Sequence, residues 1–274
     1  MDNIKIISYG EILYDVFPNA SHLGGAPLNF AVHCRKAGAD VELISAVGAD
    51  APGREAVERI SSLGVPVSSV AVLENMETGK VTITLDEKSI PTYTFDSDCA
   101  YDHIPEPSDF DADADVFCFG LLAQRGAESR KTLYSLLDKF NGKVFCDVNL
   151  RQDFYSKELL EASLSRADFA KLNEDELPVL AKMFGIAPTP EALAERFSLD
   201  VVIYTLGAAG CVVCRGKEKV ALPAAPAEVV STVGAGDAFS AAFLTSFLRD
   251  EDIRKAAETA TFAAARTTEI VGAF

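Results

Sequence analysis

STVGAGDAFSAAF, Ser231–Phe243, is the most informative stretch of this sequence, because small residues lead there from a β-rich run into a helical pattern. Gly234, Ala235 and Gly236 leave their backbone N–H groups uncovered by large side chains. Those groups should point along the axis of a helix that begins near Asp237. Free donors at the positive end of a helix form an anion-binding site. The stretch therefore predicts a site for phosphate or another anion.

Asp237 has two interpretations at that position. It could cap the helix, or it could accept the proton of a hydroxyl group that attacks a phosphoryl group. The stretch lacks the G-K-[ST] of a Walker loop, and Phe239 stands where a dinucleotide fingerprint needs its third glycine. Spacing alone leaves capping and catalysis open.

Strand-like and helical patterns alternate on both sides of this stretch. Helices are expected to begin near Pro27 and Pro52 and to end at Gly38 and Gly64, and a third is expected over Arg130–Phe140. The alternation predicts an α/β fold with a Rossmann-like, doubly wound, mainly parallel sheet, whose ligands bind at the carboxyl ends of its strands. The expected strands are short and apolar on both faces: Ile4–Ser8, Val41–Val47, Val116–Phe119, Lys143–Asp147, Asp168–Leu172 and Val201–Thr205.

Two segments depart from this alternation. Glu11–Gly25 is interpreted as an extended ribbon, and Thr78–Asp96 alternates with period two around an expected turn at Glu87–Ser89, which indicates a hairpin. Residues 11–25 and 78–96 are therefore expected to form a small β sheet on a single domain of residues 1–274. Periodicity alone leaves a lid over the site and an ordinary edge hairpin both open.

Composition excludes several classes of partner. The formal net charge is −16, so the chain should repel nucleic acids and anionic membranes. The acidic start and the absence of a long apolar run argue against a signal peptide or a membrane span, which makes the cytoplasm the expected location. Cys211 and Cys214 have C-x-x-C spacing, but residues i and i+3 on a strand point to opposite faces, so one metal could hardly bind both. We therefore expect six buried free thiols.

Six motifs, in order along the chain, resemble those of the ribokinase (PfkB) family of carbohydrate kinases, in its fructokinase form. They are LGGAPLNFA at Leu23–Ala31, FGLLAQR at Phe119–Arg125, DVNLR at Asp147–Arg151, NEDE at Asn173–Glu176, TLGAAG at Thr205–Gly210 and VGAGDAF at Val233–Phe239. The resemblance implies phosphoryl transfer from ATP–Mg²⁺ to a sugar hydroxyl.

The resemblance also implies a role for each motif residue. Asp237 would be the general base, with Gly234, Ala235 and Gly236 in the anion hole, and the sugar would be bound by Asp15, Gly24, Gly25 and Asn29. The cofactor-binding residues would be Asp147, Asn149, Asn173, Glu176, Thr205, Gly207 and Gly210, of which Asn173 and Glu176 would position Mg²⁺ through water. Taken one at a time, these residues are also suited to caps and tight turns.

The sequence departs from the family at Ser231, where many members carry an aspartate that helps to hold a monovalent cation. Activation by K⁺ is therefore not expected. The segment ending at Phe274 is shorter than in the family, which normally uses it in the cation site and the adenine pocket. A homodimer through the lid sheet is a further expectation.

Fructose is the predicted substrate, because GGAPLN and FGLLAQR are fructokinase-like. The alternatives are kinases for 2-keto-3-deoxygluconate, ribose, mannose or a nucleoside. A non-catalytic sugar-binding regulator and an NAD-dependent enzyme are further alternatives, but the intact Asp237 argues against the regulator and the missing glycine fingerprint against NAD.

Overall fold

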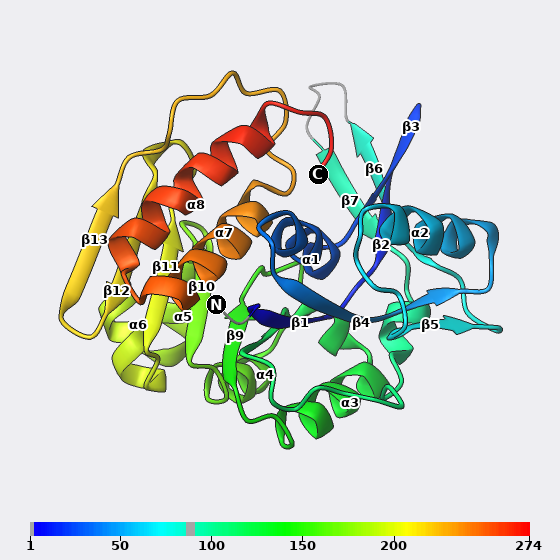
Figure 1. Ribbon diagram of the computed structural model, residues 1–274, viewed down its shortest axis with the longest axis horizontal. Coiled ribbons are helices and arrows are strands. Elements are labelled where there is room, and N and C mark those ends of the chain that lie inside the picture. The colour runs from blue at the N-terminus through cyan, green and yellow to red at the C-terminus, as the bar shows by residue number, and fades with distance from the viewer. Residues whose placement is uncertain (1–2, 86–90) are drawn as a thin grey trace.

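The computed structural model describes residues 3–85 and 91–274, and within them a nine-stranded sheet forms the centre of the molecule (Figure 1). The sheet order is β13-β12-β11-β10-β9-β8-β1-β4-β5. The strands are β1 Lys5–Tyr9, β4 Asp40–Gly48, β5 Val70–Leu73, β8 Val116–Phe119, β9 Lys143–Asp147, β10 Phe169–Asn173, β11 Val201–Thr205, β12 Cys211–Arg215 and β13 Glu218–Leu222. All neighbours are parallel except β11 with β12 and β12 with β13.

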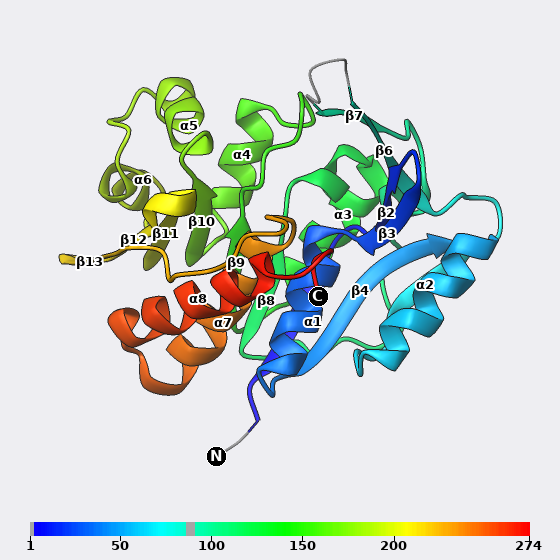
Figure 2. The same ribbon diagram turned by 90° about the horizontal axis from the view of Figure 1, so that it is seen from above.

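Helices cover both faces of this sheet (Figure 2). One face carries α1 Ala26–Lys36, α2 Ala51–Ser62, α7 Ala235–Asp250 and α8 Ile253–Thr268. The other carries α3 Ala127–Leu137, α4 Lys157–Leu164, α5 Glu176–Phe184 and α6 Pro190–Phe197. Short 3₁₀ turns lie at Ala100–His103, Leu122–Arg125 and Gly207–Ala209.

Successive residues of each central strand enter opposite cores. Ile6 packs in the core with α1 and α7, whereas Ile7 packs in the core with α3 and α4. Val201 and Val202 divide in the same way on β11. Because side chains alternate across a strand, a strand buried on both faces must be apolar throughout. This requirement explains the short apolar runs of the sequence and confirms the predicted α/β fold.

The chain changes direction across the sheet at β1. From β1 it continues to β4 and β5 on one side, and it later returns to β8 on the other side of β1 and runs outward to β11. Such a switch leaves a crevice at the carboxyl ends of the central strands. The candidate site lies at this edge.

A second sheet of four strands, in the order β3-β2-β6-β7, lies beside that edge. Its strands are β2 Leu13–Phe17, β3 Ala20–Gly24, β6 Gly79–Leu85 and β7 Pro91–Phe95. Residues 11–25 thus form a hairpin rather than a single ribbon, and it pairs with the predicted hairpin through parallel β2 and β6. The turn predicted at Glu87–Ser89 lies outside the described residues.

Each predicted strand and helix has a counterpart in the structure with bounds that differ by up to three residues, but the β-rich run before Ser231 is not a strand and β13 was not predicted. Helix α3 begins at Ala127 rather than Arg130, because Gly126 is its N-cap and Glu128 occupies its first turn. Strand β5 was not predicted, since its four residues carry too short a pattern. Helices α1 and α2 end just before Gly38 and Gly64, which have positive φ angles of 88° and 79°.

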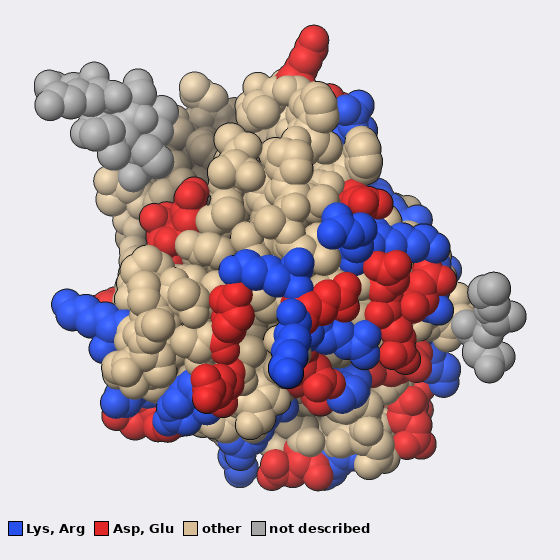
Figure 3. Space-filling view, turned by 90° about the vertical axis from the view of Figure 1, so that its left-hand side faces the viewer, with Lys and Arg blue, Asp and Glu red and all other residues tan. Residues whose placement is uncertain are grey.

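The cysteines, the surface charges and the helix lengths complete the description of the fold. All six cysteines are buried and free. On the face shown in Figure 3, basic and acidic side chains are interspersed. Within the described ranges, 3–85 and 91–274, none of the helices has both the length and the apolar character needed to cross a bilayer.

Candidate active site

A cavity of about 1410 Å³ lies between the carboxyl edge of the main sheet, the second sheet and the first turn of α7. Pockets for small ligands commonly measure roughly 300–1,000 Å³, so this cavity has room for two substrates side by side. The second sheet contributes alternate residues to it: Leu13, Asp15 and Phe17 of β2, Val81 and Ile83 of β6, and Tyr93 and Phe95 of β7. One face of that sheet therefore forms a wall of the cavity, as a lid would.

The predicted anion hole is the first turn of α7. The helix begins at Ala235, two residues earlier than expected, and Gly234 is its N-cap at a φ of 77°. The Ala235 N–H donates to the carbonyl of Thr232 at 3.3 Å. Across the described part of the chain, no hydrogen-bond partner is found for the N–H groups of Gly236 or Asp237. Both N–H groups are consequently free to bind an anion.

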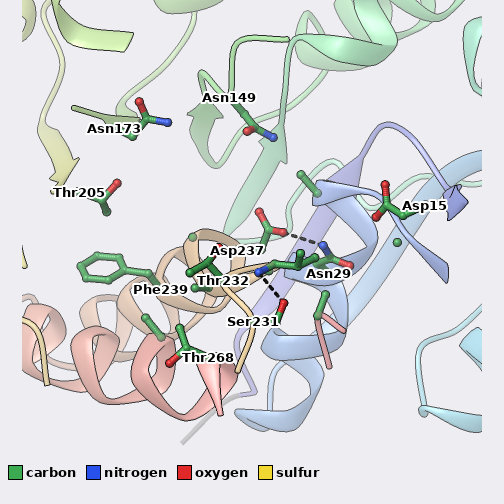
Figure 4. Close-up of a pocket in the computed structure, with 18 of the residues that line it drawn as sticks. Asp15, Asn29, Asn149, Asn173, Thr205, Ser231, Thr232, Asp237, Phe239 and Thr268 are labelled. Carbon is green, nitrogen blue, oxygen red and sulfur yellow. Dashed lines mark hydrogen bonds between the residues drawn. The ribbon is translucent and has the colours of Figure 1, made fainter. Parts of the chain in front are cut away.

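Asp237 lies at the floor of the cavity, with 9% of its surface exposed. Asn29 on α1 donates from Nδ2 to Asp237 Oδ2 at 2.7 Å (Figure 4). Burial raises the pKa of Asp237 to about 6, with a contribution from Asp147, while Lys171 and the Asn29 hydrogen bond act in the opposite direction. A carboxylate with this pKa is ionised at neutral pH and still basic enough to accept a proton.

Asp15 and Thr205 lie on opposite sides of Asp237 in Figure 4. Asp15 is half-buried on β2, opposite His22 of β3, and burial raises the pKa of its carboxyl. The chain turns between β3 and α1 at Gly25, whose φ is 111° and whose added Cβ would come within 2.3 Å of the Glu11 carbonyl. Gly24, Gly25 and Asn29 line the cavity on the Asp15 side, so all four residues predicted to bind the sugar lie in it.

On the Thr205 side, the predicted nucleotide residues occupy the ends of β9, β10 and β11. Asn149, Asn173, Thr205, Gly207 and Gly210 all line the cavity. Asn149 has a φ of 37°, a left-handed conformation that asparagine tolerates. The glycine-rich turn is also the hairpin connection between β11 and β12, as the tight-turn interpretation requires, and its nucleotide-binding role stays a prediction.

Glu176 and Asp147 lie behind the cavity wall rather than in its lining. Glu176 accepts hydrogen bonds from the N–H groups of Leu150 and Asn173, at 2.8 Å each, and so joins the loops after β9 and β10. The two residues hold the ends of neighbouring strands in place. Their predicted nucleotide and metal roles stay predictions.

Five charged residues that line the cavity were not among the predicted site residues: Glu11, Arg151, Lys171, Glu174 and Asp175. Glu11 is buried, and burial raises its pKa to about 7. Lys171 is the clearest omission, because a lysine within the apolar strand FAKLN is a visible anomaly. Ser231 also lines the cavity, and its hydroxyl accepts the Val233 N–H at 3.3 Å.

The residues next to the chain end support the anion hole. An added Cβ on Gly234 would come within 2.5 Å of the Ala273 side chain, so only glycine fits there. The imidazole of His33 on α1 is hydrogen-bonded through Nε2 to the Ala273 carbonyl at 2.8 Å. The segment around Ala273, helix α1 and the N-terminus of α7 are thus packed together.

Comparison with known proteins gives a consistent result. The model of the pfkB family carbohydrate kinases matches residues 4–273. The uncharacterized sugar kinase PH1459 of Pyrococcus horikoshii is 31% identical over 99% of this chain and 89% of its own length. A fructokinase of Salmonella typhimurium is 27% identical over 89% of this chain and 84% of its own length.

Solved structures agree with the fold. That of PH1459 in complex with ATP has a TM-score of 0.87 at 28% identity and covers 98% of this chain and 93% of that one. A fructokinase of Vibrio cholerae with fructose, ADP and calcium ion bound has a TM-score of 0.85 at 23% identity, covering 98% of this chain and 94% of that one. The fold, the site and the family match together establish that this chain belongs to the pfkB family of carbohydrate kinases.

Proposed function

We propose that this chain is an ATP-dependent fructokinase with Asp237 as its general base. The observation that carries the proposal is the buried Asp237 carboxylate, which lies beside the free N–H groups of Gly236 and Asp237 at the positive end of α7. A base and an anion hole in contact are the parts that phosphoryl transfer to an alcohol requires.

The substrate hydroxyl would lose its proton to Asp237 as its oxygen forms a bond to the γ-phosphorus of ATP. The bond from that phosphorus to the bridging oxygen would break, and ADP would leave. The free N–H groups of the α7 turn would stabilise the charge on the phosphoryl oxygens. Asn29 would keep the base oriented through its 2.7 Å hydrogen bond.

Asp15 would bind the sugar from the lid side. A carboxylate can accept hydrogen bonds from two neighbouring hydroxyls, and each such charge-assisted bond contributes about 1.5–3 kcal/mol. The lid sheet would close over the sugar and exclude water, which would otherwise compete for the phosphoryl group.

Mg²⁺ is compatible with the site only as a partner of the nucleotide. Over the residues that the structure describes, no group of three or more His, Cys, Asp or Glu side chains could hold a metal ion directly. Mg²⁺ commonly keeps several waters and binds substrate phosphates, and Asn173 beside the cavity suits contact through such a water. When bound, the ion would neutralise phosphate charge.

Fructose is favoured as the acceptor because fructokinases recur among the relatives, including those of Salmonella typhimurium and Klebsiella pneumoniae at 27% and 29% identity. A nucleoside is the second candidate. Phe17, Tyr93 and Phe95 on the lid face are aromatic side chains at the cavity, and such a wall could pack against a nucleobase.

A coupled ADP-release assay over fructose, ribose, mannose, 2-keto-3-deoxygluconate and two nucleosides tests the proposal. We expect the highest kcat/KM for fructose, and no turnover in the Asp237→Asn variant. A nucleoside preferred over fructose by about tenfold or more would move the assignment to the second candidate. A wild-type protein that binds a sugar but turns over none of them would favour the non-catalytic regulator.

A further inference from the structure

Lys171 is a buried charged residue next to the anion hole. It lies on β10 with 5% of its surface exposed, and its Nζ donates to Asp147 Oδ1 at 3.1 Å and to Oδ2 at 3.3 Å. Strand alternation directs it to the same face as Phe169, which packs edge-on against Phe247 of α7. The ammonium therefore points from the sheet toward the helix that carries the candidate base.

Gly236 is the point at which the ammonium meets α7. A Cβ built on Gly236 would lie 3.1 Å from Lys171 Nζ, tighter than an ordinary contact. The φ angle of Gly236 is not positive, so the helical backbone itself does not demand a glycine there. A glycine inside a helix costs about 1 kcal/mol relative to alanine. The close approach of the ammonium supplies a reason to accept that cost.

Lys171 also has an unused donor that faces the cavity. An ammonium has three N–H donors, and Asp147 is the one acceptor found for it among residues 3–85 and 91–274. Lys171 lines the cavity, whereas Asp147 does not. An anion bound at Gly236 would therefore lie within reach of the free N–H.

The charge balance of the cavity makes this donor important. Among the described lining residues, the only lysine or arginine side chains are Arg151 and Lys171. Burial works to lower the pKa of Lys171, but the attraction of Asp147, Glu176 and Asp237 outweighs it and leaves the pKa raised. The side chain is accordingly positively charged at neutral pH, in a chain of formal net charge −16.

We propose that Lys171 is a catalytic residue, whose free N–H donates to an oxygen of the phosphoryl group as that group passes the N–H groups of Gly236 and Asp237. This inference rests on the proposed function. No proton leaves Lys171 in the step: the ammonium stabilises charge while Asp237 takes the hydroxyl proton. The competing explanation is that Lys171 only neutralises the buried carboxylate of Asp147.

A double-mutant cycle separates the two explanations. Lys171→Met is measured in the wild-type background and in the Asp147→Asn background, where the carboxylate that Lys171 is hydrogen-bonded to has lost its charge. We expect kcat to fall about 100-fold or more in both backgrounds. If the effect of Lys171→Met disappears in the Asp147→Asn background, Lys171 is only a counter-ion and the proposal is wrong. The second background also covers the case in which Lys171→Met alone fails to fold.

A binding measurement tests the contact without turnover. In MgCl₂, aluminium fluoride added to ADP mimics the phosphoryl group in transfer, and we expect it to raise Tm further than ADP alone. That additional rise should be absent from Lys171→Met/Asp147→Asn, with the rise shown by Asp147→Asn as its reference. Lys182→Met, which removes an exposed lysine of α5, should leave it unchanged.

The outcomes distinguish this inference from the proposed function. If the wild type phosphorylates none of the sugars but keeps a Lys171-dependent response to aluminium fluoride, the fructokinase assignment fails and the phosphoryl contact stands. If the double variant keeps the full response, or if the wild type shows none, Lys171 does not contact a bound phosphoryl group.

Discussion

Replacing Asp237 with asparagine separates a catalytic base from a structural cap. Asparagine has nearly the same shape and keeps an oxygen that can accept the Asn29 hydrogen bond now made at 2.7 Å. It cannot take up a proton from the attacking hydroxyl. We therefore expect kcat to fall at least ~100-fold, with ATP binding and the fold retained.

The same substitution has a predictable effect on stability. The pKa of Asp237 is raised from 3.8 to about 6 in the folded protein, mainly by burial. Between these two values the folded chain holds a proton that the unfolded chain has lost, so the free energy of unfolding falls as pH rises through this window. The difference corresponds to about 3 kcal/mol, fully expressed above pH 6.

Urea unfolding of both proteins across this pH range measures the effect. The asparagine side chain of the variant does not titrate, so the stability of Asp237→Asn relative to the wild type should rise by about 3 kcal/mol from below pH 4 to above pH 6. Contributions from groups that do not interact with Asp237 cancel in the comparison. A parallel pH dependence would refute the raised pKa, and a kcat near that of the wild type would show that Asp237 is a cap.

The site supports four further predictions. Asp15→Ala should raise the sugar KM at least ~10-fold with little change in the ATP KM; a folded variant with unchanged sugar KM and kcat would place the sugar elsewhere. In the wild type, kcat/KM should fall about tenfold per pH unit below about pH 6 and level off above it, since Asp237 must be ionised. A decline that begins only near pH 3.8, the usual pKa of an aspartate, would contradict this. Because Ser231 lacks a charge, rates in KCl and in tetramethylammonium chloride should be similar, and strong stimulation by K⁺ would disprove the expectation. Sedimentation velocity should give a homodimer through the lid sheet, whereas a monomer at every concentration would exclude one.

The sequence alone was enough for the fold, and most of the site residues predicted from it line the cavity. Short runs that are apolar on both faces indicate central strands, and small residues just before a helical pattern indicate a helix whose first N–H groups are open to a ligand. Asp237 and Asn29 lie in two of the quoted motifs, whose local geometry is short-range, whereas the role of Asp15 was implied by the family resemblance. Such local motifs can be recognised without knowledge of the tertiary structure.

Only the tertiary structure showed which of these side chains meet. Asn29 and Asp237 are 208 residues apart, and their hydrogen bond depends on how α1 packs beside α7. The Lys171 ammonium lies next to Gly236 because β10 of the sheet and helix α7 are packed against each other. Glu176 points away from the cavity because its carboxylate accepts hydrogen bonds from two backbone N–H groups. The pattern of a single strand or helix records which face is buried, but the layer packed against that face sets the partner of each polar group.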